Sequence, residues 1–440
     1  MLSPPPHASP LAAGATIPLS FIFAGLFAAF ASSAALVLFP STLALPHLHM
    51  HVVALAHAWL LGALLTICFG AVYQLLPVVA NTAFTGRTQA WTHLALHLLG
   101  TGAMIAGFLR GDMLLVASGG TLVSLGVALF SANVVRTLRT APRIDPILLA
   151  FAAAAAWLVL TVTAGLLLAL NLHFAWWNLD VLALLRAHAH AGVAGFFVTL
   201  TQGAMFRLVP MFTLAGPPDL RRVAVALAAS QSGLLVLIFA LTLDATPAIL
   251  LGAALLLASF TLSAFELRRI LTTRKKKLLE PGLRGFFAGL ALLAFSALGG
   301  TALALTSDNH LRAALAYAVV AILGGVLAVV QGMLCKIIPF LVWMRVYGPR
   351  VGRQRTPVAA SLGRPACERT WLLAHVAATV ALATGALTAH PLTLTCGALL
   401  LAGGQLSLAL SLSSAARHLW RPDAPQPLTP SFSRPQTAAS

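Results

Sequence analysis

Among the residue types of this chain, histidine is the best candidate for binding a cofactor. The chain has 14 histidines and only ten acidic residues among 440. His57, His188 and His190 lie within long apolar runs. A neutral imidazole can bind haem iron, copper or zinc, and placing it in lipid costs free energy unless it is bonded. These three histidines are therefore the candidate cofactor ligands.

The spacing of these histidines limits which of them can share one centre. His188 and His190 lie two residues apart, roughly 200° around a helix, so they cannot both face one centre unless the helix is distorted. Two facing helices can instead supply one histidine each, as cofactor sites in helix bundles do. His57 and His190 are the first such pair, with His188 as a further candidate. The alternative interpretation is that all three make interhelical hydrogen bonds.

A second group of histidines, HLHMH, occupies residues 47–51 just before His57. His47 and His51 would share a face of a helix, and imidazoles together with the thioether of Met50 suit copper. His47, His49 and His51 are therefore candidate metal ligands, although such tracts are also often solvated loops. His93 and His97, one turn apart at the start of an apolar run, could form half a site or lie at the membrane interface.

The acidic residues exclude several functional classes. All ten lie in connections or at the ends of apolar runs, so none is expected at mid-membrane. Proton-coupled and sodium-coupled transporters usually need a carboxylate there. The four cysteines are scattered, without a CxxC pair, which argues against a disulfide scaffold.

The apolar runs predict an all-α, polytopic membrane protein. Hydrophobic residues make up 59% of the chain and charged residues 8%, far from the composition of soluble domains. Only helices suit such runs, because a bilayer forces each segment to pair its own backbone groups. We expect a transmembrane domain over residues 1–420 and a disordered cytoplasmic tail over 421–440, which is rich in Pro, Ser and Thr. The twelve spans lie at roughly 13–39, 51–79, 91–110, 113–135, 146–170, 183–213, 222–243, 246–266, 284–305, 311–344, 370–389 and 391–415.

Lys and Arg predict the orientation of these spans. The connections after even-numbered spans, with their flanking ends, hold 24 of the 27 basic residues. By the positive-inside rule both termini are cytoplasmic, as in a multi-pass protein of the bacterial inner membrane. The net charge of +17 thus reflects orientation in a lipid bilayer, and we expect no nucleic-acid partner.

An internal repeat organises the chain. Three segments end in the same pattern at offsets of 133 and 129 residues, about four spans each, namely AHAWLLGALLTICFGAVYQLLP to Pro77, AHAGVAGFFVTLTQGAMFRLVP to Pro210 and AVVAILGGVLAVVQGMLCKIIP to Pro339. This pattern predicts three pseudo-symmetric four-helix units, with the last two spans joining the first two to close a ring.

The repeat also relates the candidate ligands to one another. His57 and His190 occupy the same repeat position as Val319, whereas His188 corresponds to Leu55 and Tyr317. Three residues before each shared Pro stand long polar side chains that we expect to reach the membrane interface, with ion or proton entry as the alternative; these are Gln74, Arg207 and Lys336.

The first repeat segment resembles a span of the haem–copper oxidase and nitric oxide reductase superfamily. In that span a haem-ligating His is followed about 14 residues later by Gly-small-small-aromatic and then Pro. By this resemblance His57 matches the haem ligand, and His190 falls in the span that carries the family's first copper ligand. A weaker likeness is to NnrS-type haem and copper membrane proteins. The resemblance implies haem b and copper as cofactors, oxidoreductase chemistry in respiration, nitric oxide response or oxidase assembly, and a cytochrome or other respiratory subunit as partner.

This chain also departs from the superfamily pattern. The seventh span, VAVALAASQSGLLVLIFALTLD, lacks the family's histidine pair, and the tenth reads LAYAVVAILGG without histidine. A complete oxygen-reducing centre is therefore not expected, and a single haem or copper is the main hypothesis. The alternatives are a transporter or copper-handling permease without haem, and a structural subunit without a cofactor.

Overall fold

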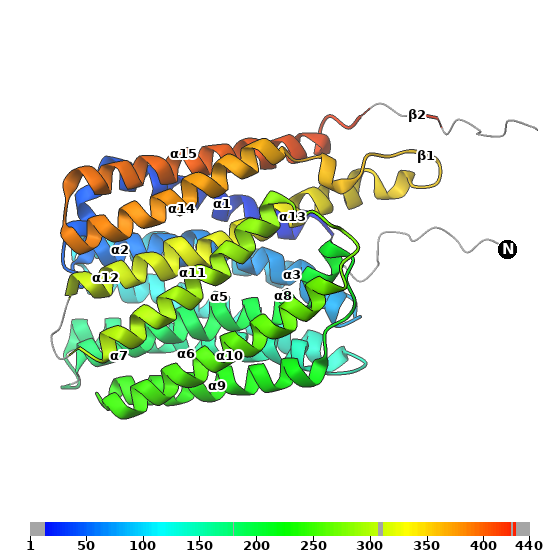
Figure 1. The fold of residues 1–440 in the computed structure, drawn as a ribbon. Coiled ribbons are helices and arrows are strands. Elements are labelled where there is room, and N and C mark those ends of the chain that lie inside the picture. The colour runs from blue at the N-terminus through cyan, green and yellow to red at the C-terminus, as the bar shows by residue number, and fades with distance from the viewer. Residues whose placement is uncertain (1–13, 179, 307–310, 424–425, 428–440) are drawn as a thin grey trace, which may run out of the picture.

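The computed structural model describes residues 14–178, 180–306, 311–423 and 426–427. Within them, twelve helices are long and apolar enough to cross a membrane, and they lie side by side in one bundle (Figure 1). The predicted all-α membrane fold is thus confirmed. The strands in the described residues are β1 (Gln354–Arg355) and β2 (Gln426–Pro427), which pair in antiparallel fashion over two residues each. Most of the predicted tail, 421–440, lies outside the described residues.

Nine of the twelve spanning helices are continuous α-helices. They are α1 (Thr16–Leu38), α4 (Arg87–Arg110), α5 (Met113–Thr140), α6 (Pro146–Phe174), α9 (Leu220–Thr242), α10 (Thr246–Thr272), α11 (Pro281–Ala304), α14 (Pro365–Thr388) and α15 (Pro391–Ala416). Several extend past the apolar runs, as where α4 begins at Arg87, because basic residues propagate a helix beyond the lipid-facing stretch. The predicted spans thus locate the helices but not their ends.

The other three spanning helices each contain a π-helical segment. The second span consists of α2 (Met50–His57), η2 (Ala58–Leu65) and α3 (Thr66–Val79). The sixth consists of α7 (Val181–His190), η3 (Ala191–Val198) and α8 (Thr199–Thr213), and the tenth of α12 (Leu311–Val319), η4 (Val320–Val326) and α13 (Leu327–Val346). The π segments begin at Ala58, Ala191 and Val320, so they recur at the offsets of the sequence repeat. Each begins directly after the position of His57, His190 or Val319.

The π segments need side-chain hydrogen bonds, because a wider helical turn leaves carbonyls without their usual partners. Leu61 O accepts from the Thr66 hydroxyl at 2.9 Å and from His97 Nε2 at 3.0 Å. The equivalent hydroxyl in the second repeat, on Thr199, lies 3.4 Å from Ala194 O. In the third repeat His375 Nε2 donates to Gly324 O at 3.0 Å. Buried polar side chains therefore hold the distorted helices in shape.

The chain order sets the order of the helices around the bundle. Sequential neighbours pack together, and α15 returns to pack on α1 (Figure 1). Both lie at the same edge, as the predicted ring closure requires, whereas the grouping into three four-helix units remains a prediction. The connections 141–145, 214–219, 273–280 and 347–364 lie at one end of the bundle, called the basic end below.

Four of the ten acidic residues cap the N-termini of helices. Asp112, Asp145, Asp180 and Asp219 are the N-caps of α5, α6, α7 and α9, where each carboxylate accepts a backbone N–H of the first turn. Their positions at helix starts explain why the sequence places acids between apolar runs.

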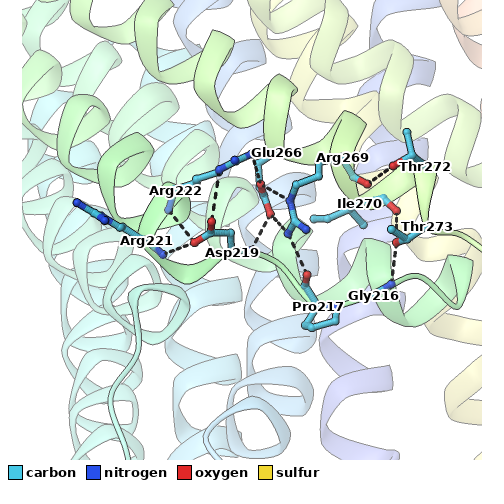
Figure 2. A network of polar contacts seen from close by, with 10 residues as sticks. All are labelled: Gly216, Pro217, Asp219, Arg221, Arg222, Glu266, Arg269, Ile270, Thr272 and Thr273. Carbon is cyan, nitrogen blue, oxygen red and sulfur yellow. Dashed lines mark hydrogen bonds and ion pairs between the residues drawn. The ribbon is translucent and has the colours of Figure 1, made fainter.

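A buried carboxylate ties the connection before α9 to the end of α10 (Figure 2). Glu266 is 1% exposed, and its carboxylate accepts from Arg269 Nε at 2.9 Å and from the Asp219 backbone N–H at 2.7 Å. Arg222 lies 3.7 Å away on α9. Opposite charges and a backbone donor thus compensate this carboxylate for its loss of water.

Lys336 is buried close to the basic end. This residue is 7% exposed, and its ammonium pairs with Glu280, which precedes α11. Its position at the membrane interface stays a prediction. The pairing connects α13 to the basic connection 273–280 and leaves the ammonium compensated.

We expect Glu266→Ala to destabilise the protein by about 1–3 kcal/mol, since it strands the Asp219 N–H and two half-exposed arginines. Thermal unfolding in mild detergent measures the change. Asp244→Asn removes the charge of a 75%-exposed partner of Arg186 and keeps a side chain that tolerates the left-handed backbone at this position (φ 50°), so it is the matched control and should change stability by about 0–1 kcal/mol. Equal unfolding temperatures for the two variants would contradict this assignment.

Candidate functional site

A cavity of about 270 Å³ lies among the second to sixth spans, beside η2 and η3 and the helices α2 and α7 that precede them. Leu, Val, Met and Phe side chains from α2, η2, α4, α5, α6, α7 and η3 form nearly all of its wall. His57 and His188 are the titratable side chains among its lining residues. An apolar cavity with a few convergent polar groups is the usual form of a small-molecule site. It is called the histidine cavity below.

The two imidazoles of this cavity are oriented in the same way. His57 Nδ1 lies 2.8 Å from Val53 O, and His188 Nδ1 lies 3.1 Å from Thr161 O. Since a carbonyl oxygen only accepts, each Nδ1 carries the hydrogen and each Nε2 keeps its lone pair. In the described residues neither Nε2 has a protein partner. Both rings are therefore prepared to act as ligands through Nε2.

Contacts on either side position these rings. The His57 ring packs against Phe108 of α4, with ring centroids 4.8 Å apart. The His188 ring lies against Gly165 of α6, where an added Cβ would stand 2.7 Å from its Cε1 atom. The absence of a side chain at Gly165 is what allows His188 to occupy this place.

His190 lies elsewhere, as its angular separation from His188 predicts. Its Nδ1 donates to Arg186 O at 2.8 Å, and its Nε2 lies 3.2 Å from the Tyr317 hydroxyl of α12. His190 is not among the residues that line the histidine cavity. The structure thus brings together His57 and His188, rather than His57 and His190.

The repeat explains this pairing. The equivalent residues His57 and His190 of the sequence repeat each face a residue of the next repeat, so they lie at two different interfaces. His57 shares a cavity with His188 of the second repeat, and His190 in turn meets Tyr317, the equivalent of His188 in the third. The sequence does hold a signal for this pairing: a comparison of each position with the neighbouring repeat matches His57 with His188 and His190 with Tyr317.

The HLHMH group does not converge on one point. His49 is the N-cap of α2, accepting the His51 N–H at 3.2 Å, and the His49 and His51 rings lie 4.9 Å apart. Burial, together with the charge of Arg186, lowers the pKa of His47 below its ordinary value. Over the part of the chain that the structure describes, no group of three or more His, Cys, Asp or Glu side chains is placed to hold a metal ion.

His93 and His97 are buried, which the sequence did not predict. Both are 0% exposed rather than interfacial. They lie beneath the histidine cavity, among Phe21, Phe69 and Phe130. Their i, i+4 spacing on an apolar helix is the sequence signal for such a pair, although it does not show which helices cover them.

We expect Gly165→Ala to destabilise the fold by about 1–3 kcal/mol, because the new methyl overlaps the His188 ring. Thermal unfolding in mild detergent is again the measurement. Gly299→Ala on α11, where an added Cβ meets nothing within 4 Å, is the matched control. A Gly165→Ala protein as stable as the control would show that the ring does not depend on this glycine.

Comparisons with known proteins add no identification. Neither a scan against protein-family models nor a search of the curated proteins found a match to this chain. The likeness to the haem–copper oxidase superfamily therefore stays an expectation from the sequence. The structural evidence on function is the cavity and its two imidazoles.

Proposed function

We propose that this chain is a haem-binding integral membrane protein in which His57 and His188 would hold one b-type haem. The observation that carries the proposal is the shared cavity of two imidazoles, each with its Nδ1 hydrogen bonded to a backbone carbonyl and its Nε2 free to ligate. Bound haem would supply one-electron redox chemistry.

The number of ligands favours haem over copper or zinc. A porphyrin supplies four nitrogens of its own, so two protein imidazoles would suffice to hold its iron. Protein zinc sites instead need three or four protein ligands, and copper electron-transfer sites need at least three. The described residues bring no third His, Cys, Asp or Glu to the two cavity histidines.

The cavity wall is apolar and its side chains can adapt to an apolar ring. The cavity volume of about 270 Å³ lies below the roughly 300 Å³ at which small-molecule pockets begin, so a haem would have to displace side chains of the wall. Met50, Met104 and Met113 form part of the wall, and methionine side chains adapt readily to the shape of a ligand. Gly120 and Gly192 leave further parts of the wall without side chains.

The residues of this chain would orient the ring and exclude water. Val53 O and Thr161 O fix the ligand nitrogens, and Phe108 and Gly165 fix the planes of the imidazoles. Such a centre would transfer electrons within a respiratory membrane, with a cytochrome or other respiratory subunit as its partner. In our proposal this is the bacterial inner membrane, with both termini and the basic end in the cytoplasm.

Two variants test the assignment directly. We expect His57→Ala and His188→Ala each to lower the haem content of purified protein at least tenfold, because each removes one of the two imidazoles that would hold it. The measurement is the pyridine haemochrome spectrum per mole of protein, together with metal analysis for copper.

His190→Ala is the matched control, since it removes a half-buried imidazole of the same helix outside the cavity, and it should keep its haem. A wild-type protein without a Soret band would refute the haem proposal. Bound copper without haem would instead favour the copper-handling alternative.

A further inference from the structure

Two arginines at the end of the last spanning helix have no partner among the described residues. Arg417 and Arg421 follow α15 closely, at the basic end of the bundle, and both are exposed (Figure 1). Neither guanidinium makes an ion pair or a hydrogen bond within the part of the chain that the structure describes. Arg222, Arg269 and Lys336 are instead paired with carboxylates. The charges of Arg417 and Arg421 are therefore available to a ligand.

The local backbone puts these two arginines and Trp420 on one side of the chain. Residues 417–421 continue the helix as a tight turn, in which the N–H groups of Trp420 and Arg421 donate to Arg417 O at 3.1 and 2.8 Å. The i, i+3, i+4 spacing therefore places Arg417, Trp420 and Arg421 on the same face. Together with Asp423 they line an open pocket of about 430 Å³, and Trp420 is 74% exposed.

The opposite side of the same turn is fixed to the end of α13. His418 is 4% exposed, and its Nδ1 lies 2.7 Å from the Tyr347 hydroxyl oxygen. The Asp423 backbone N–H donates to the same oxygen at 2.9 Å. Arg350 lies over the Tyr347 ring, with its guanidinium carbon 5.7 Å from the ring centroid. These contacts hold the pocket in shape before any ligand arrives.

A row of exposed leucines on α15 leads directly to this pocket. Leu399, Leu406 and Leu410 precede Arg417 at spacings of i−18, i−11 and i−7, so at about 100° per residue they lie within about 20° of it around the helix. Each of these leucines is about half exposed, whereas other parts of α15 pack on α1, α13 and α14. This row is called the leucine stripe below. In a bilayer it contacts acyl chains, which are as apolar as leucine itself.

The position of the pocket favours a lipid headgroup over a soluble anion. The twelfth spanning helix runs from Pro391 to Leu419, so Arg417 and Trp420 lie where the span ends and the headgroup region begins. Tryptophan is enriched at this interface, and arginine binds phosphate through two parallel hydrogen bonds. Two guanidiniums and one carboxylate, that of Asp423, give the pocket a net charge of +1. A headgroup with net negative charge complements it.

We propose that this pocket binds the headgroup of one anionic phospholipid, whose acyl chains lie along the leucine stripe. Arg417 and Arg421 contact the phosphate, and Trp420 lies beside the glycerol. Because α15 packs on α1, the bound lipid braces the contact between the first and the last spanning helix. This inference is independent of the proposed haem.

Native mass spectrometry of the purified chain in mild detergent tests the pocket, with phosphatidylglycerol, phosphatidylethanolamine and phosphatidylcholine as separate probes. We expect wild type to bind one phosphatidylglycerol more tightly than either zwitterionic lipid. Arg417→Gln combined with Arg421→Gln should weaken that binding about thirtyfold, since each arginine near an anionic lipid contributes about fivefold in affinity. Asp423→Asn keeps the backbone hydrogen bond to Tyr347 and removes the opposing charge, so it should tighten phosphatidylglycerol binding severalfold.

Arg139→Gln combined with Arg143→Gln is the matched control, because it removes two exposed arginines from the same end of the bundle but outside the pocket. It should change the affinity for phosphatidylglycerol by less than about threefold. Equal losses in the two double variants would show only a general attraction of the basic end and overturn the proposed pocket. Tighter binding of phosphatidylethanolamine, or release of the lipid by excess inorganic phosphate, would overturn it as well. All four arginines are exposed, so both double variants should unfold at the wild-type temperature.

Discussion

The helices that carry His57, His190 and Val319 each change their winding halfway through the bundle, and the rest of the structure has to satisfy the carbonyls that this releases. In a bilayer there is no water to do so, and each stranded carbonyl would cost several kcal/mol. Thr66 with His97, Thr199, and His375 supply the donors at η2, η3 and η4. Polar residues that look isolated in an apolar sequence are thus requirements of the backbone. One of these donors, His97, also ties α4 to Leu61 in the cavity wall.

The π segment also divides each of these helices into two parts with different contacts. On the side of the basic end, the three helices pack through the small residues and aliphatic side chains before Pro77, Pro210 and Pro339. On the other side, the faces that carry His57 and His190 are rotated relative to that packing, because a π segment shifts the register of a helix. The histidines can therefore face neighbouring helices without disturbing the core below them.

The sequence predicts the membrane fold well and the site only in part. The twelve helices follow from apolar runs whose length and composition leave no other structure, and the different directions of His188 and His190 follow from helical geometry. The structure does not bring His57 and His190 together, because each of these equivalent residues faces a different neighbouring helix. Burial of His93 and His97 depends on Phe21 and Phe130, which come from two other helices and have no sequence signal of contact. The π segments have the composition of any apolar helix, so composition alone does not indicate them.

The contact between His190 and Tyr317 bears on whether a second cofactor site could arise in this fold. The first pair of neighbouring repeats presents two imidazoles, the second an imidazole and a phenol, and the third has only Val319 and Leu55 at the matching positions. Tyrosine and histidine codons differ by a single base. Under the haem proposal, one nucleotide exchange at Tyr317 would give the second boundary its own pair of imidazoles, and the aliphatic third boundary would limit that duplication to two.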